Sequence, residues 1–283
     1  MSTRPDQTPA PHGVDAHAHV FVRGLPMKSD RRHSPDYDAT LREYLDWLDR
    51  CGLRYGVLVQ PSFLGTDNHY MQQALRACPQ RLRGVAVVDP AIDDAALDAL
   101  AADGVVGIRL NLVGLPLPDL ASPAWRALLP RIAGRGWHVE LHRAAGDLPT
   151  LLPPLQAAGC DIVIDHFGRP DPALNGADPG WQYLLTQIRD YGRIWTKLSA
   201  PYRNWTPGPD DAGPHARALA RQLLAAGGPQ RLMWASDWPH TQHQHLADFP
   251  RSLRWLEDWI PDPATRAQIL HDTPVALFKL EET

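Results

Sequence analysis

Eight short hydrophobic runs recur along the chain, and longer amphipathic stretches separate them. Each run is rich in Val, Ile or Leu and is too short for an ordinary helix, so each is predicted to be a buried strand. The runs are Gly13–Val20, Tyr55–Gln60, Leu82–Val88, Val105–Leu112, Trp137–His142, Asp161–Asp165, Arg193–Ser199 and Arg231–Ser236.

The stretches between the runs carry helical spacing. Apolar side chains repeat on one face around Leu41–Leu48, as a helix packed on a sheet requires. Further helices are predicted over Asp93–Ala102, Ser122–Arg135, Leu148–Ala158, Trp181–Tyr191 and His215–Ala226. The proline-rich segment Pro201–Pro214 is predicted to be a long loop, and Pro261–Leu280 a closing helical tail.

Strands that alternate with helices predict a parallel α/β fold, and eight such strands in 283 residues predict a single-domain (β/α)8 TIM barrel. An open doubly wound sheet is the rival, but its first strand usually leads into a glycine-rich phosphate loop. Here the first run ends in histidines. We expect the barrel to occupy residues 13–283. Residues 1–12 are expected to be a mobile leader, without the apolar stretch of a signal peptide or anchor.

Charge and cysteine content narrow the function further. The net charge is −4 and basic residues form no long run, which argues against a nucleic-acid partner. No apolar run has the length of a membrane span, so no membrane partner is expected. Cys51, Cys78 and Cys160 lie far apart and are expected to be buried free thiols of a cytoplasmic protein. The oligomeric state cannot be read from the sequence.

Reactive groups of such a barrel lie at the carboxyl ends of its strands. His17 and His19 end the first run two residues apart, so they share a face and can bind one metal ion or one oxyanion. Asp237 follows the last run between two tryptophans, which limit water around it. We predict that Asp237 is a general base; the alternative is a helix cap.

Two arginines and a further histidine also stand at strand ends. His166 begins a tight turn fixed by Gly168 and Pro170, which would direct Arg169 to the mouth, where it can bind a carboxylate; the alternative is a pair with Asp171. Arg109 interrupts a buried strand and therefore needs a partner, either Asp89 or an anionic substrate.

These motifs resemble the lactonases of the amidohydrolase superfamily, and most of all the 2-pyrone-4,6-dicarboxylate lactonases. The similarity covers most of the chain after residue 12, in Val14–Val20, Val59–Ser62, Gly65–Asn68, Gly84–Asp93, Gly107–Asn111, Ile164–Asp171 and Ser236–His240. The resemblance implies hydrolysis of a small anionic cyclic ester. It implies that Asp237 activates water, that His17, His19 and His166 surround the reacting carbonyl, and that Arg109, Arg169 and Arg203 bind the substrate carboxylate. Gln60, Ser62 and His240, at the ends of the second and eighth runs, complete the expected substrate-binding set.

The chain departs from that pattern at two places. The lactonases carry a second arginine shortly after the one that matches Arg109, whereas Leu112–Pro116 contains no base. Arg143 could supply a replacement cation, but strand alternation points Arg143 away from His142. His142 stands where those lactonases have Tyr, so His17, His19, His142 and Asp237 form a possible zinc set. A reaction that requires no cofactor is favoured, and one divalent ion, zinc, is the alternative.

Three rival functions remain open at this point. A lactone isomerase would use the same scaffold but exclude water. A decarboxylase of the same superfamily would need a metal ion and would release CO2. A non-catalytic binding barrel is the least favoured, because it has no need of a base beside clustered imidazoles.

Overall fold

The computed structural model describes residues 12–280 apart from 175 and 206–208, and the side chains of 209–212 are also not described. The predicted leader therefore lies outside the described residues, except for His12.

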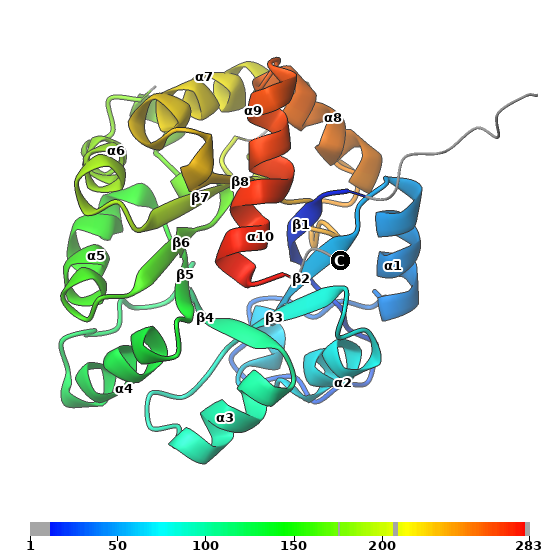
Figure 1. Ribbon diagram of the computed structural model, residues 1–283, viewed down its shortest axis with the longest axis vertical. Coiled ribbons are helices and arrows are strands. Elements are labelled where there is room, and N and C mark those ends of the chain that lie inside the picture. The colour runs from blue at the N-terminus through cyan, green and yellow to red at the C-terminus, as the bar shows by residue number, and fades with distance from the viewer. Residues whose placement is uncertain (1–11, 175, 206–208, 281–283) are drawn as a thin grey trace, which may run out of the picture.

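Eight strands form one parallel sheet in the order β1 to β8, and the sheet curls into a barrel (Figure 1). The strands are β1 Val14–Ala18, β2 Tyr55–Val59, β3 Leu82–Ala86, β4 Val105–Asn111, β5 His138–His142, β6 Asp161–Ile164, β7 Ile194–Leu198 and β8 Leu232–Trp234. Each of the eight hydrophobic runs contains one of these strands, so the predicted (β/α)8 barrel is confirmed.

The two edges of the sheet meet between β1 and the segment after β8. The amide of Asp237 donates to the carbonyl of His17 over 3.0 Å, and the amide of His19 donates to the carbonyl of Trp238 over 2.8 Å. The buried carboxylate of Asp15 also accepts from the amide of Ser236 over 2.8 Å. These bonds bring the ends of β1 and β8 together, and with them the predicted histidines and the predicted base.

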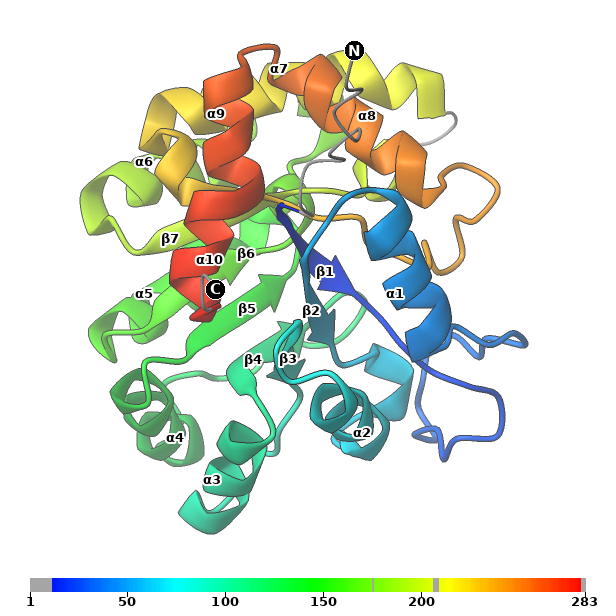
Figure 2. The ribbon, with the colours of Figure 1, turned by 45° about the vertical axis from the view of Figure 1, so that its right-hand side comes forward.

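Helices surround the barrel (Figures 1 and 2). They are α1 Leu41–Arg50, α2 His69–Ala77, α3 Asp94–Ala102, α4 Pro123–Gly134, α5 Leu148–Ala157, α6 Pro179–Tyr191, α7 Pro209–Gly227 and α8 Phe249–Trp259. The sequence analysis missed α2, although Met71, Ala74 and Leu75 have helical spacing and are buried. It also extended the loop after β7 too far, because α7 begins at Pro209, where a proline fits the first helical turn.

The predicted helical tail is confirmed as α9 Pro263–Ala267, a π-helical turn at Gln268–Asp272 and α10 Thr273–Phe278. Figure 1 shows α10 lying across one end of the barrel. Phe278 packs into an apolar cluster with Val14, Ala16 and Tyr55. This end of the barrel is therefore filled and covered, which leaves the carboxyl ends of the strands as the open end.

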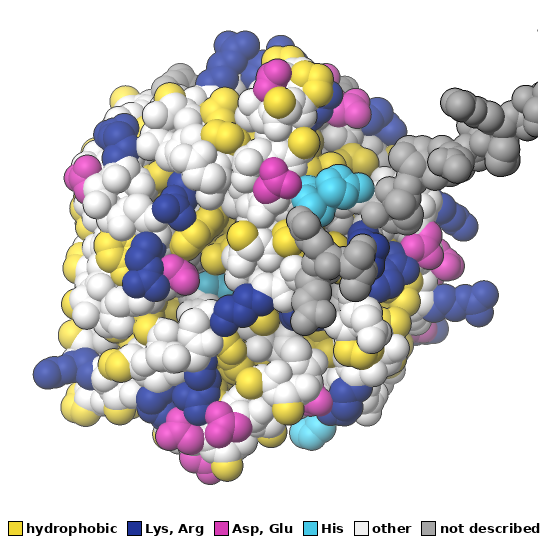
Figure 3. All heavy atoms as spheres, in the orientation of Figure 1, with side chains coloured by type: hydrophobic (Ala, Val, Ile, Leu, Met, Phe, Trp, Pro, Cys, Tyr) yellow, Lys and Arg dark blue, Asp and Glu magenta, His cyan; other side chains and the backbone are white. Residues whose placement is uncertain are grey.

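The surface charge, the helices and the cysteines can be compared with what the sequence predicts. On the face seen in Figure 3, basic and acidic side chains are interspersed and form no field of one sign. Within residues 12–280, as far as they are described, no helix is long and apolar enough to span a bilayer. All three cysteines are free thiols, but only Cys160 is buried, while Cys51 and Cys78 are half-buried.

Candidate active site

A pocket of about 270 Å³ opens at the carboxyl ends of the strands. It brings together most of the strand-end residues singled out in the sequence: His19, Ser62, Arg109, His142, His166, Arg169, Arg203 and Asp237. It also takes in residues that the sequence analysis did not single out for the site, notably Arg32, Phe63 and Tyr202.

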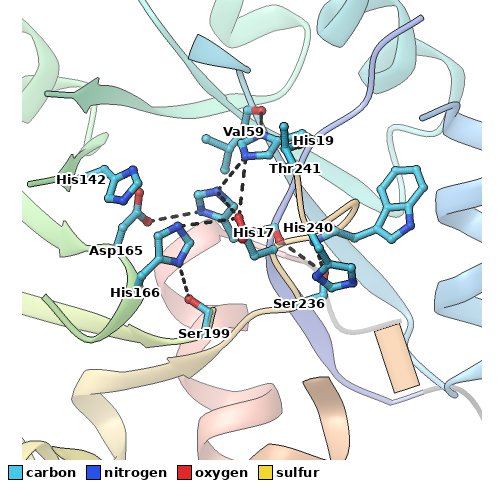
Figure 4. A network of polar contacts seen from close by, with 12 residues as sticks. His17, His19, Val59, His142, Asp165, His166, Ser199, Ser236, His240 and Thr241 are labelled. Atoms are coloured by element: carbon cyan, nitrogen blue, oxygen red, sulfur yellow. Dashed lines mark hydrogen bonds and ion pairs between the residues drawn. The ribbon is translucent and has the colours of Figure 1, made fainter. Parts of the chain in front are cut away.

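The floor of the pocket holds two imidazoles from β1 whose tautomers follow from their neighbours (Figure 4). His19 Nδ1 lies 2.7 Å from the carbonyl oxygen of Val59, which can only accept, so Nδ1 carries the proton. His19 Nε2 is then an acceptor, and His17 Nε2, at 3.3 Å, is the donor to it. His17 Nδ1 lies 3.0 Å from Lys197 Nζ and 3.3 Å from both Glu140 Oε1 and Asp165 Oδ1. The contact with His19 places a proton on His17 Nε2.

The two carboxylate oxygens of Asp237 differ, because one accepts hydrogen bonds and the other does not. Its Oδ2 accepts from the Tyr202 hydroxyl over 2.7 Å and from Arg203 Nε over 2.8 Å. Its Oδ1 is buried and has no hydrogen-bond partner among the described residues. It lies 3.7 Å from Nε2 of His166, 3.9 Å from that of His17 and 4.0 Å from that of His19. Burial alone would raise the pKa of Asp237, but the charge of Arg203 outweighs it and holds the pKa well below its usual range. The carboxylate is therefore ionised, with a free oxygen facing three imidazoles.

His166 comes from the end of β6 and lies against β7. Its Nδ1 is 2.8 Å from the Ser199 hydroxyl (Figure 4). Its buried Nε2 has no hydrogen-bond partner within the part of the chain that is described. Burial holds the pKa of His166 well below its usual range, and burial does the same for the pKa of His19. The neutral imidazoles of His19 and His166 therefore lie beside the free oxygen of Asp237.

Beneath the imidazoles lies a cluster of four buried charged side chains, which we call the floor cluster: Arg109, Glu140, Asp165 and Lys197. Arg109 contacts Asp165 at 2.8 Å and Glu140 at 3.1 Å, and Lys197 pairs with both carboxylates. Burial would raise the pKa of Asp165, but Lys197 and Arg109 hold it well below its usual range. The partners of Arg109 are thus these two carboxylates rather than Asp89.

The zinc set predicted from the sequence is assembled only in part. His17, His19 and Asp237 have ligand atoms within 4.8 Å of one another, and so do His17, Asp165 and His166. His142 belongs to no such group among the described residues. Its Nδ1 lies 3.3 Å from Arg109 Nη2 and its Nε2 lies 3.5 Å from Arg169 Nη1. The expectation that His142 joins the other three around one ion is therefore corrected: its ring lies between two guanidinium groups.

Several site residues have left-handed backbone, which non-glycine residues rarely adopt. The φ angles are +48° at His166, +47° at Arg169, +60° at Asp237 and +58° at His240. Such conformations cost free energy and persist where the surroundings enforce them, commonly at functional sites. Their concentration at the ends of β6 and β8 agrees with the position of the pocket.

Two predicted substrate-binding residues do not line the pocket. Gln60 is buried and its amide donates to the carbonyl of Asp67 over 2.6 Å, so it holds the loop after β2. His240 is buried behind Tyr202, with Nδ1 3.1 Å from the hydroxyl.

Sequence reasoning also missed Glu140. A signal was present, because Glu140 lies two residues before His142 on β5 and therefore shares its inward face. Arg32 gave no such signal, since it lies in the loop between β1 and α1.

The chain was compared with known proteins and their structures. The family model for amidohydrolases matches residues 14–280. The chain belongs to the amidohydrolase family. This match covers nearly all of the described barrel, including the ends of β1, β6 and β8, where the candidate site lies.

Curated relatives of this amidohydrolase act on lactones. The chain is 31% identical to a 2-pyrone-4,6-dicarboxylate hydrolase of Comamonas testosteroni, over 95% of this chain and 90% of the relative. It is 31% identical to a 4-sulfomuconolactone hydrolase of Rhizobium radiobacter, over 93% and 89% of the two chains. A D-galactarolactone isomerase of Agrobacterium fabrum is 26% identical, over 94% and 91%.

Solved structures agree with the fold. A candidate 2-pyrone-4,6-dicarboxylic acid hydrolase of Pseudomonas putida is 46% identical, with a TM-score of 0.90 over 96% of this chain and 99% of that one. A candidate enzyme of the same kind from Acinetobacter baumannii, solved with citric acid bound, is 38% identical, with a TM-score of 0.90 over 95% and 99%.

Proposed function

We propose that this amidohydrolase opens a carboxylate-bearing lactone by hydrolysis, with Asp237 as the base that activates water. The observation that carries the proposal is the free, ionised Oδ1 of Asp237 in front of three imidazoles. The relatives that hydrolyse lactones support the reaction class. The arginines around the pocket support a substrate that carries negative charge.

The proposed reaction begins with a water molecule between Asp237 Oδ1 and the lactone carbonyl. Asp237 takes one proton while the water oxygen bonds to the carbonyl carbon, which produces a tetrahedral oxyanion. The proton on His17 Nε2 is placed to donate to that oxyanion, and buried donors of this kind stabilise developing charge strongly. The ring C–O bond then breaks, the leaving oxygen takes the proton from Asp237, and the new acid loses its own proton to solvent.

We infer that the reaction requires no metal ion, because Arg203 already matches the charge of the Asp237 carboxylate, and Arg109 and Lys197 match the charges of Glu140 and Asp165. A divalent ion would add positive charge beside these three cations, which opposes its binding. A divalent ion at this place would be held by His17, His19 and Asp237, and would polarise the carbonyl.

Isomerisation is the second candidate, because a relative is a lactone isomerase. In that reaction the acyl group passes from one hydroxyl of the substrate to another, and no water is consumed. The two candidates therefore differ in the origin of the product oxygen.

The test is a lactone panel assayed in ¹⁸O-labelled water: 2-pyrone-4,6-dicarboxylate, a muconolactone and an aldarolactone. We expect ring opening of an acidic lactone with one labelled oxygen in the new carboxylate. Conversion without label would establish isomerisation instead. No conversion of any acidic lactone would contradict the proposed function.

A further inference from the structure

Four arginines line the pocket, and they fall into two pairs. Arg109 and Arg203 are neutralised by the protein, because Arg109 pairs with Asp165 and Glu140, and Arg203 pairs with Asp237. In the floor cluster the two carboxylates balance Arg109 and Lys197. These two arginines therefore bring no uncompensated charge to the pocket.

Arg32 and Arg169 lack such partners. Arg32 donates to the Asn111 side-chain oxygen over 3.2 Å, and Arg169 lies 3.5 Å from His142 Nε2. Within the described part of the chain neither forms an ion pair. The Asp171 carboxylate, a sequence-based candidate partner for Arg169, caps the amide of Ala173 over 2.9 Å. Burial and the neighbouring arginines lower the pKa of both guanidinium groups, which agrees with uncompensated charge on this side of the pocket.

Arg32 lies at the segment after β4, where this chain lacks the second arginine of the lactonases that it resembles. Its partner Asn111 ends β4, and a Cβ on Gly114 would lie 3.3 Å from Arg32 Cδ. Gly114 has a φ of +71°, so this turn favours a residue without a side chain and leaves the space to Arg32. Arg32 thus packs over Leu112–Pro116, the segment that contains no base.

Arg143 does not take the place of that second arginine. It donates to the carbonyls of Leu112 and Leu115 and pairs with Asp147 at 2.5 Å. It therefore holds the loop after β4 from behind, and it does not line the pocket.

We propose that Arg32 is a specificity-determining residue that binds a second acidic group of the substrate, while Arg169 binds the first. This inference rests on the proposed function and deepens it: the substrate is a lactone with two acidic groups. Two guanidinium groups from separate loops favour two separate anions, because each can bind a carboxylate through two parallel hydrogen bonds.

The test measures binding without turnover, by titration calorimetry at fixed ionic strength. The probes are isophthalate, a flat ring with two carboxylates, and benzoate, the same ring with one. Wild-type protein is expected to bind isophthalate more tightly than benzoate. Arg32→Gln is expected to weaken isophthalate binding by about tenfold or more, the usual effect of losing a charge-assisted hydrogen bond, and benzoate binding by about twofold at most.

The matched control is Arg31→Gln, which removes the same charge from the neighbouring residue. Arg31 donates to Ser34 and to the carbonyl of Lys28, and it does not line this pocket. We expect Arg31→Gln to change neither dissociation constant by more than about twofold. Arg32→Lys should recover part of the isophthalate affinity, because it restores the charge without the planar fork.

Two results would overturn the role of Arg32: an isophthalate affinity that Arg32→Gln leaves unchanged, or equal losses for isophthalate and benzoate. Because neither probe reacts, these results are independent of the lactone panel. A protein that binds isophthalate through Arg32 but opens no lactone would refute the proposed function alone.

Discussion

The floor and the rim of the pocket use charge in opposite ways. The floor cluster buries two carboxylates with two cations, and Asp237 above it is matched by Arg203. The rim holds Arg32 and Arg169, each with one polar side-chain contact and, as far as the chain is described, no carboxylate partner. Balanced charges that cannot reorient are suited to holding reacting groups in place. Unbalanced charges near solvent are suited to binding an anion that arrives from outside.

The difference between floor and rim also predicts which charged residues stabilise the folded protein. Buried pairs become strongly destabilising when one partner is removed, whereas exposed charges contribute little to folding. Substitutions in the floor should therefore affect folding or the chemical step, and substitutions in the rim should affect binding. Two predictions test this contrast, and a third concerns His138, which packs against Phe278 at the covered end of the barrel. They run from the largest expected effect to the smallest.

Removal of the base should have the largest effect. Asp237→Asn keeps the shape of the side chain but removes its ability to take a proton, so kcat on an accepted lactone should fall by roughly 10²- to 10⁴-fold. Asp89→Asn is the matched control, because Asp89 also follows a strand at the open end but is exposed and caps the amide of Ala91. A kcat for Asp237→Asn within tenfold of wild type would show that another group activates water.

Removal of the buried cation should have the next largest effect. Lys197→Met leaves Glu140 and Asp165 with Arg109 as their remaining cation, which should lower the free energy of unfolding by about 3–5 kcal/mol. Arg32→Gln should lower it by less than about 0.5 kcal/mol, because Arg32 is exposed.

Urea unfolding at pH 7 measures both values. Lys197→Met combined with Glu140→Gln should recover part of the loss, because it removes the one carboxylate charge that Arg109 leaves uncompensated. Equal losses of unfolding free energy for Lys197→Met and Arg32→Gln would contradict the contrast between the floor and the rim.

The pH dependence of stability should show the smallest effect. Burial lowers the pKa of His138 to about 4, whereas an unfolded histidine titrates near 6.5. The unfolded chain therefore binds the extra proton first as the pH falls. His138 therefore leaves the free energy of unfolding unchanged above about pH 6.5. Between about pH 6.5 and pH 4 it lowers that free energy as the pH falls, by at most about 1.4 kcal/mol per pH unit.

A comparison of wild type with His138→Phe isolates the effect of His138 on the pH dependence of stability. The free energy of unfolding should fall less between pH 7 and pH 5 in the variant than in wild type. The same fall in both proteins would mean that His138 does not titrate differently in the folded state.

The amount that could be predicted from sequence differs between strands and loops. Strand-end residues such as His17, His166 and Asp237 could be placed, because hydrophobic runs locate the strands and parallel strands bring their ends together. The partners of Arg109 could not, since the register of β4 against β5, which sets Arg109 opposite Glu140, and the contact with Asp165 depend on the packing of the barrel.

Positions that depend on loop conformation were harder still. His142 was expected in one ligand group with His17, His19 and Asp237, but its ring packs edge-on against His166 and lies between Arg109 and Arg169. Strand order does not determine that choice. Arg32 belongs to a loop without periodicity, and its place over Gly114 depends on the path of two loops. The positions of strand ends were thus predictable, whereas the partners that side chains meet across the barrel or on loops were not.

The most direct test of the account concerns the floor, where hydrogen bonds and balanced charges are proposed to support catalysis without a metal ion. The measurement is kcat/KM for hydrolysis of 2-pyrone-4,6-dicarboxylate by protein treated with a chelator, with residual metal determined in the same sample. We predict the same value, within about twofold, in treated and untreated protein. Loss of activity in proportion to metal removed, with recovery on addition of zinc, would contradict the account.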